Sequence, residues 1–293
     1  MASPNNLPDF DTLWDYDRPS ETERRFRELL PYAEASGDAD YYLELLTQIA
    51  RAQGLQRQFD EAHATLDYVM DYLDGLPTQT TVRYLLERGR VFNSSKQRDE
   101  ARPLFFEAWR IASDLGADRY AVDAAHMLAI VEPPEQQMEW NLVALNLAEN
   151  SADPKARRWL GSLYNNIGWT YHQNGQYEEA LKTFVKALAW REAQNQPKEA
   201  RIARWCVGRA LRSLGRYEEA LAVQTEVAAL IAASGDEDGY VSEEIGECLL
   251  ALGREDESRD YFARAYEVLS ADTWLADNEP DRLTRLSQLA GFG

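Results

Sequence analysis

The chain has 293 residues, 45% of them hydrophobic, and a formal net charge of −19 at pH 7. An acidic surface repels phosphate backbones and anionic lipids, so nucleic acids and membranes are not expected as partners. The 16 glycines and 11 prolines are too few for a fibrous or disordered chain, and two cysteines do not indicate a disulfide scaffold. The charge serves either solubility or attraction to basic partners.

The sequence shows no sign of a targeting or membrane segment. No apolar run approaches the ~20 residues that a membrane span requires. The opening residues, MASPNNLPDFDTLW, lack the basic and apolar regions of a signal peptide. Cys206 and Cys248 lie in helical patterns and are expected to stay reduced, so the sequence predicts a cytoplasmic protein.

Residues 1–18 are rich in Pro and Asp and show no helical period, yet they include Phe10, Leu13, Trp14 and Tyr16. Disordered tails seldom contain so many aromatic residues. Two interpretations remain open: the segment docks as a cap on the rest of its own chain, or it is a short linear motif for a partner. Both rest on the large apolar area that an aromatic side chain buries.

Helical periodicity begins after residue 18, with Ser20 as the expected N-cap of a single helix. Three helix pairs are then predicted over residues 40–73, 80–115 and 119–150. The third pair has an unusual turn, Glu132-Pro133-Pro134-Glu135, where proline starts a new helix. Its second helix is expected to carry Leu145 and Ala148 as packing markers.

The fourth pair, residues 156–194, has the clearest pattern. Apolar side chains recur at the three-and-four spacing of helix faces, and Asn174-Gly175 marks the turn between the two helices. Gly168 is small where a neighbouring backbone must come close. The apolar positions are Leu163, Tyr164, Ile167, Tyr171, Tyr177, Leu181, Phe184 and Leu188.

This stretch closely resembles the tetratricopeptide repeat (TPR) family. The matching residues are Tyr164, Ile167, Gly168, Tyr171, Gly175, Tyr177, Ala180, Phe184 and Ala187. The pattern recurs over residues 198–234 and 239–270, with a period near 39–40 that exceeds the ~34 usual for this repeat.

The resemblance implies an all-α fold, a right-handed α-α superhelix of about six helix pairs. A half repeat would precede the pairs and a capping helix over residues 279–290 would follow them. We therefore expect a single TPR solenoid over residues 19–293, preceded by the extended segment 1–18.

No constellation of catalytic residues is evident. The three histidines form no HExxH pair, and no GxSxG, Walker or dinucleotide motif occurs. The sequence therefore predicts a protein that is not an enzyme, with no cofactor and no metal.

In TPR proteins the first helix of each pair faces the concave groove. Carrying that property onto matching positions predicts a peptide-binding groove whose middle holds Asn, His, Trp and Arg, although the chain as a whole is acidic. The far end turns acidic, with Glu243, Glu244 and Glu247. The candidate residues are Arg51, Arg90, Asn93, His126, Asn165, Asn166, Trp169, His172, Trp205, Arg209 and Arg212.

Such a groove suits an extended peptide with a central acidic group. Arg209 and Arg212 would pair with that group, and Trp169 and Trp205 would hold an apolar side chain. Alternatively, the two tryptophans pack between neighbouring first helices. The predicted function is a protein-interaction scaffold, a monomer or weak homodimer. The alternatives are a regulator that senses a peptide or metabolite, and self-assembly through residues 1–18.

Overall fold

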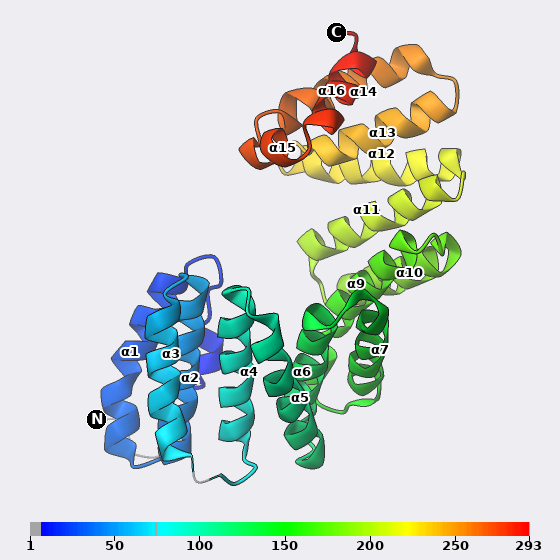
Figure 1. The fold of residues 1–293 in the computed structure, drawn as a ribbon. Coiled ribbons are helices and arrows are strands. Elements are labelled where there is room, and N and C mark those ends of the chain that lie inside the picture. Colours follow the sequence, from blue (N-terminus) through cyan, green and yellow to red (C-terminus); the bar gives the residue numbers. More distant parts are fainter. Residues whose placement is uncertain (1–6, 74, 293) are drawn as a thin grey trace. The chain divides into compact units, whose positions relative to one another are not determined.

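The computed structural model describes residues 7–73 and 75–292. Within these ranges the regular secondary structure is helical, which confirms the all-α prediction. The chain divides into two compact units, here called unit 1 (residues 1–159) and unit 2 (residues 160–293). In Figure 1 unit 1 runs from blue to green and unit 2 from green to red.

Unit 1 begins with a short 3₁₀ helix and a single long helix, and then continues as helix pairs joined by tight turns (Figure 1). Its elements are η1 (Phe10–Leu13), α1 (Pro19–Ser36), α2 (Ala39–Leu55), α3 (Phe59–Tyr72), α4 (Gln79–Ser94), α5 (Arg98–Asp114), α6 (Asp118–Val131), α7 (Pro134–Asn150) and α8 (Pro154–Arg157).

Unit 2 has the same organisation and ends in a helix that packs on the last pair. Its elements are α9 (Leu160–Gln173), α10 (Tyr177–Ala193), α11 (Pro197–Ser213), α12 (Tyr217–Ala233), α13 (Gly239–Ala251), α14 (Glu255–Leu269), α15 (Thr273–Asn278) and α16 (Pro280–Ala290).

Most turns inside the pairs have one residue in the left-handed region, whereas the turn between α6 and α7 has none. In unit 2 this residue is Gly175, Gly215 or Gly253, each with φ of 74°. In unit 1 a residue with a side chain takes the same role in two pairs, Arg57 with φ of 63° and Lys96 with φ of 67°. A side chain makes this conformation costly, whereas glycine adopts it freely.

Close packing within a pair depends on a glycine of the first helix. A Cβ atom added to Gly168 would lie 2.5 Å from the ring of Phe184, and one added to Gly89 would lie 2.6 Å from the ring of Phe105. Both rings are fully buried. The glycine therefore lets the aromatic ring of the second helix rest directly on the backbone of the first.

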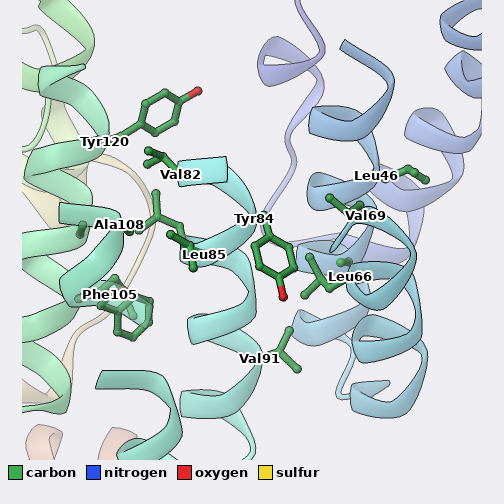
Figure 2. Close-up of a cluster of buried hydrophobic side chains, with 14 of the residues drawn as sticks. Leu46, Leu66, Val69, Val82, Tyr84, Leu85, Val91, Phe105, Ala108 and Tyr120 are labelled. Carbon is green, nitrogen blue, oxygen red and sulfur yellow. The ribbon is translucent and has the colours of Figure 1, made fainter. Parts of the chain in front are cut away.

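The core of unit 1 continues through successive layers because its helices have apolar residues on two sides. Figure 2 shows Tyr84 of α4 pointing toward Leu66 of α3, while Leu85 of α4 points toward the side where Phe105 and Ala108 of α5 lie. All five side chains are buried. Each helix pair thus covers the apolar face that its neighbour leaves open, as in other helical repeats.

Two details differ from the sequence prediction or extend it, and a third confirms it. The first long helix begins at Pro19 with Arg18 as its N-cap, so the prediction of Ser20 was wrong; proline at the first helical position fixes the start. The short helices α8 and α15 were not predicted. The pair α6–α7 has its turn where the two prolines predicted it.

Candidate binding faces of the first helices

The first helices of the pairs each present one side to a common surface in each unit. We give the name first-helix face of unit 1 to one row of side chains on α2, α4 and α6. These side chains contact residues 7–18 or continue the row of those that do. They are Gln48, Arg51, Arg83, Glu87, Arg90, Asn93, Arg119, Tyr120 and Asp123.

Residues 7–18, here called the N-terminal segment, dock on this face. Phe10 is 5% exposed, and its ring centroid lies 6.3 Å from that of Phe26 and 5.1 Å from that of Tyr41. The ring centroid of Trp14 lies 5.2 Å from that of Phe26, and its Nε1 donates a hydrogen bond of 3.0 Å to Oε1 of Gln48. Of the segment 1–18 for which two interpretations were open, residues 7–18 dock on their own chain, and residues 1–6 lie outside the described residues.

An ion cluster fixes the segment between these rings. Arg83 is 4% exposed and donates to both carboxylate oxygens of Asp11, at 2.6 and 3.2 Å. Arg83 also donates to the Tyr120 hydroxyl at 2.8 Å, and Arg119 lies 3.5 Å from Asp11. Burial opposes ionisation of Asp11, but the hydrogen bond and charge of Arg83 outweigh it and lower the pKa of that carboxyl.

Three of the predicted groove residues come together next to the segment, where the guanidinium of Arg51 lies 5.5 Å from the Trp14 ring centroid and 5.4 Å from that of Tyr16. Arg51, Arg90 and Asn93 line a pocket of about 190 Å³. Both arginines donate to the buried Glu87, at 3.2 Å from Arg51 and 2.7 Å from Arg90. Arg90 also pairs with Asp123 of α6. The charges in this part of the face are therefore already balanced.

His126, the remaining candidate of unit 1, is apart from that pocket. Its ring centroid lies 5.0 Å from that of Trp159. Burial lowers the pKa of His126, with the positive charge of Arg90 acting in the same direction. The imidazole is therefore neutral at pH 7 and serves the packing of unit 1.

The corresponding surface of unit 2 is here called the first-helix face of unit 2. It consists of one row of side chains from each of α9, α11 and α13, spaced three or four residues apart. The members are Trp169, His172, Ile202, Trp205, Arg209, Arg212, Tyr240, Glu243, Glu244 and Glu247.

Trp169 and Trp205 lie together on this face, with ring centroids 6.0 Å apart. Trp169 also packs on the buried ring of Phe184 at 5.3 Å and on His172 at 5.2 Å. Both tryptophans are half-buried. They therefore pack between neighbouring first helices and still present part of their rings to the face.

A polar chain connects the next residues. Nε2 of His172 lies 2.9 Å from Oγ of Ser213, and Arg209 donates to the same oxygen at 2.6 Å. Burial lowers the pKa of His172, and Arg209 lowers it further. The imidazole is therefore neutral at pH 7, so it can bond to Ser213 without opposing the neighbouring guanidinium.

Two of the arginines of α11, Arg209 and Arg212, share one carboxylate. Arg212 forms a bidentate pair with Glu244 of α13, with bonds of 2.7 and 2.8 Å, and Arg209 lies 3.3 Å from the same side chain. Burial lowers the pKa of Arg209, and Glu244 only partly opposes this effect. Because Glu244 also forms the bidentate pair with Arg212, Arg209 has only a share of one carboxylate and is incompletely neutralised.

The predicted acidic end of the groove pairs with the last helix. Glu243 accepts from Arg282 of α16 at 3.0 Å, and Glu247 pairs with Arg285 of the same helix. The capping helix thus neutralises the two carboxylates of this row on α13 that the arginines of α11 do not bind.

The two asparagines of α9 are half-buried. Oδ1 of Asn165 lies 3.6 Å from Sγ of Cys206, and the backbone oxygen of Asn166 accepts from Thr170 at 3.0 Å. Burial raises the pKa of Cys206 to about 12, as it does for Cys248. Both thiols are therefore protonated and poorly reactive at neutral pH.

An apolar pocket opens beside Trp205, between α11 and α13. Its volume is about 410 Å³, and Val227 and Ile231 of α12 contribute to its lining. Ile202 is 59% exposed and Tyr240 is 38% exposed at this pocket. Sequence reasoning missed these two residues, although Ile202 lies one turn before Trp205 on the same row. Arg201, Asp238 and Val241 complete the lining.

Gln224 of α12 is another residue that sequence reasoning missed. It follows Gly208 by 16 residues, the same separation as from Gly168 to Phe184, so an amide stands where another pair has a ring. Gln224 is fully buried, and its Nε2 donates to the backbone oxygen of Trp205 at 3.0 Å. Its Oε1 has no hydrogen-bond partner. The helix pair α11–α12, which contributes to the lining of the pocket, is thus the pair in which a buried amide bonds to the backbone of Trp205.

The third pair shows the same substitution. Asn141 of α7 is buried with Ala144 and Ala148, whereas Leu145 is only half-buried. The predicted marker Leu145 was therefore wrong; Ala148 is buried as predicted, but the residue that follows Asn141 by three, as Ala187 follows Phe184, is Ala144. The register was misassigned because Asn141 does not have the large apolar side chain that usually identifies this position.

Residues 7–73 and 75–292 offer neither a metal site nor a membrane span. They contain no group of three or more His, Cys, Asp or Glu side chains placed to hold a metal ion. No helix in the same ranges combines the length and apolar character that a membrane crossing demands.

Comparison with known proteins identifies the repeat. The sequence model described as tetratricopeptide repeat matches residues 162–189. The chain is 26% identical over 261 residues to outer dynein arm-docking complex subunit 4 of Xenopus laevis. That alignment covers 86% of this chain and 47% of the relative, so the chain spans about half the length of the curated protein it matches.

Solved structures share the fold. The apo form of RapI superposes with a TM-score of 0.76 and 12% identity, covering 97% of this chain and 78% of that one. The STAND ATPase with a tetratricopeptide-repeat sensor from Pyrococcus horikoshii has a TM-score of 0.73 and 15% identity, over 94% and 44%. NprR bound to its cognate peptide NprX has a TM-score of 0.51 and 18% identity, over 92% and 78%. At these identities the similarity shows the fold alone.

Proposed function

We propose, from the premise that this chain is a tetratricopeptide-repeat protein, that it is an interaction scaffold whose first-helix face of unit 2 binds an extended segment of a partner protein. The fold is one that typically serves protein interaction rather than catalysis. A fold does not decide a function, so the proposal rests on the chemistry of this face.

The observation that carries the proposal is an open apolar pocket next to an incompletely neutralised guanidinium. The pocket of about 410 Å³ lies between α11 and α13, with the exposed side chain of Ile202 at its wall. Arg209 follows Trp205 by four residues, which is about 6 Å along an α-helix. An apolar side chain and an acidic group separated by one or two residues of an extended peptide span this distance.

Each part of the site contributes differently to binding. The pocket excludes water from an apolar side chain and supplies most of the affinity, because burial of such a side chain contributes about 1.5–3 kcal/mol. A carboxylate at Arg209 adds a charge-assisted hydrogen bond and selects acidic peptides. Trp169 and the chain from His172 to Arg209 hold the rings and the guanidinium in place.

A peptide-display selection against the full chain tests the proposal. We expect enrichment of peptides that carry a large apolar residue next to, or one residue from, Asp or Glu. Ile202→Asp and Arg209→Gln should each weaken the enriched peptide at least tenfold in a fluorescence-anisotropy titration. Arg259→Gln is the matched control, since Arg259 is an exposed arginine of the same unit on a second helix.

The results separate the two parts of the proposal. If Ile202→Asp abolishes binding and Arg209→Gln leaves it unchanged, the face binds peptides without a preference for acidic ones. If the enriched peptides bind both variants as tightly as the wild-type chain, this face is not the binding site. The sensing alternative differs in its ligand: a free short peptide or metabolite would raise the melting temperature of the chain without any partner protein.

The cytoplasmic location predicted from the sequence belongs to the same proposal. Cys206 and Cys248 are free and buried, which suits a reducing compartment. An interaction scaffold in that compartment would meet its partner segment without crossing a membrane.

A further inference from the structure

The first-helix face of unit 1 already holds a peptide, the N-terminal segment of its own chain. The segment contacts side chains that are far away in sequence and belong to successive elements. Trp14 bonds to Gln48 of α2, Asp11 to Arg83 of α4 and Arg119 of α6, and Asp9 to Lys155 of α8 at 3.4 Å. The segment therefore crosses the row of first helices in the way that a bound ligand would.

Two aromatic side chains anchor the segment around one ring. Phe10 and Trp14 both meet Phe26 edge to face, and Phe10 is the deeper of the two at 5% exposure. The guanidinium of Arg83 lies 5.0 Å from the Phe10 ring centroid. Beyond Trp14, Tyr16 is 58% exposed, but its ring stacks on Trp14 with centroids 4.7 Å apart and lies 5.4 Å from the guanidinium of Arg51. Phe10 is thus the most deeply buried determinant of the segment, and Tyr16 adds a contact at its exposed end.

The site between these rings requires a carboxylate. Arg83 and Arg119 supply two positive charges, and the carboxylate that the helices themselves bring near Arg83 is Glu44, at 3.5 Å. Asp11 supplies the second carboxylate from the segment. Without the segment the cluster would keep an excess of positive charge in a half-buried place, so it would attract another acidic group.

The segment is a separate layer and belongs to no helix pair. A short connection, residues 15–18, ties it to the start of α1 at Pro19. A tether of this length gives the segment a local concentration in the millimolar range, so a moderate intrinsic affinity is enough to keep it docked. A peptide with the same determinants and a higher affinity, or a higher concentration, would replace it.

We propose that the first-helix face of unit 1 is a second peptide site, closed by the N-terminal segment, which accepts from a partner an acidic segment of the form Phe-Asp-x-x-Trp. The recognition elements are the ring of Phe26, the guanidinium groups of Arg83 and Arg119, and the amide oxygen of Gln48. This second site lies in unit 1, so it stands independently of the binding proposed for unit 2.

The test uses the full chain and a labelled synthetic peptide of residues 7–18. We compare the wild-type chain with a loosened chain that carries Phe10→Ser and Trp14→Ala. The loosened chain should bind the peptide at least tenfold more tightly than the wild-type chain, because its own segment no longer competes. A peptide with Asp11→Asn should bind the loosened chain at least tenfold more weakly, and so should the normal peptide when Arg119→Gln is added to that chain.

Hydrogen exchange on the wild-type chain provides a second measurement that needs no substitution. A large excess of unlabelled peptide should accelerate exchange of the amides of residues 10–14 in the protein, because the bound peptide displaces them. This measurement carries the test if circular dichroism shows that the loosened chain has lost its helices.

Two results would overturn the proposal. One is failure of displacement. In that case a loosened chain that keeps its helical signal does not bind the peptide, or residues 10–14 of the wild-type chain exchange at the same rate with and without excess peptide. The segment would then be a permanent structural part of unit 1. The other is equal binding of the normal and the Asp11→Asn peptides, which would remove the carboxylate from recognition.

Discussion

The first-helix faces of the two units are built from equivalent helices but are in different states. In unit 1 the N-terminal segment covers the row, and the carboxylate of Asp11 pairs with the buried Arg83. In unit 2 a pocket of about 410 Å³ stays open beside Trp205, and Arg209 has only a share of Glu244. The same arrangement of helices can therefore present either a closed or an open surface, depending on where the compensating carboxylate comes from.

The source of that carboxylate is the main physical difference. Unit 1 obtains it from a segment that is distant in sequence, whereas unit 2 obtains Glu244 from the next first helix. A carboxylate on a neighbouring helix is held permanently, but one on a tethered segment can leave. Unit 1 is therefore suited to regulation by displacement and unit 2 to direct binding. Substitutions in the two units can test this contrast, and the largest effect is expected at the buried ion cluster of unit 1.

Replacing Arg83 by Met should strongly destabilise unit 1. Arg83 is buried, and its loss would leave the carboxylates of Asp11 and Glu44 without their main partner. Breaking a buried ion pair from one side costs about 3–5 kcal/mol. Urea unfolding followed by circular dichroism would measure the loss.

The matched control is Arg110→Met. Arg110 forms exposed pairs with Glu107 and Asp114 within α5, and such pairs contribute little to stability. We expect its unfolding curve to overlay that of the wild-type chain. Equal effects of the two substitutions would show that Arg83 is not the central ion of unit 1.

Gln224→Phe should make unit 2 more stable and its binding face less suited to a ligand. The ring would occupy the position that Phe184 has in the preceding pair, and the unpaired Oε1 of Gln224 would be removed. Removal of a buried unsatisfied polar atom together with added apolar burial contributes about 1–2 kcal/mol. The hydrogen bond to the backbone of Trp205 would be lost, so we expect weaker peptide binding at the adjoining pocket.

Two measurements on the Gln224→Phe chain separate these effects. Thermal or urea unfolding should shift toward higher stability, and the titration with the selected peptide should show reduced affinity. The reverse substitution, Phe184→Gln, is the control and should destabilise unit 2, because it buries an amide where a ring packs on Gly168. A destabilised Gln224→Phe chain would mean that the amide is required for the fold.

Stability should fall as the pH decreases from 7.5 to 5.5 in both units. Burial lowers the pKa of His126 in unit 1 and of His172 in unit 2 below the ordinary value of 6.5. The folded state then binds fewer protons than the unfolded state. This stability is present above pH 6.5 and is lost as the pH falls through the folded pKa. Each histidine contributes at most about 1.4 kcal/mol per pH unit.

Urea midpoints of His126→Gln and His172→Gln across this pH range would measure each contribution. Asp123 and Arg90 act on the pKa of His126, and Arg209, Glu244 and Arg212 act on the pKa of His172. We expect a flatter dependence on pH in each variant. If both variants keep the wild-type slope, protonation of these two imidazoles does not limit stability in acid.

The fold could be predicted from the sequence because its signals are local. Helical periodicity and the turn at Asn174-Gly175 depend on residues a few positions apart, and the structure has α9 and α10 on either side of that turn. Docking of the N-terminal segment on its own chain was one of two interpretations of the sequence, but its place could not be predicted, since Asp11 meets Arg83 across 72 residues. The aromatic content of residues 1–18 indicated burial without indicating where.

The sequence predicted several residues of the candidate site but not which of their side chains pair with one another. The arginines of α11 were identified from their row, but Glu244 reaches them only through the register between α11 and α13, which the sequence does not specify. Gln224 did have a sequence signal, its distance of 16 residues from Gly208. That signal was missed because an amide interrupts a pattern that is otherwise recognised by its aromatic residue.

The smallest expected effect concerns the turns. Lys96 has φ of 67° at a position where unit 2 uses Gly175, Gly215 and Gly253. A side chain in the left-handed region costs about 1–2 kcal/mol, and part of the gain from glycine is lost to the greater freedom of the unfolded chain. Lys96→Gly should therefore stabilise unit 1 by about 0.5–1 kcal/mol in urea unfolding. Gly175→Lys is the opposite change in unit 2 and should destabilise it. If both changes destabilise the chain, Lys96 has a role beyond the turn.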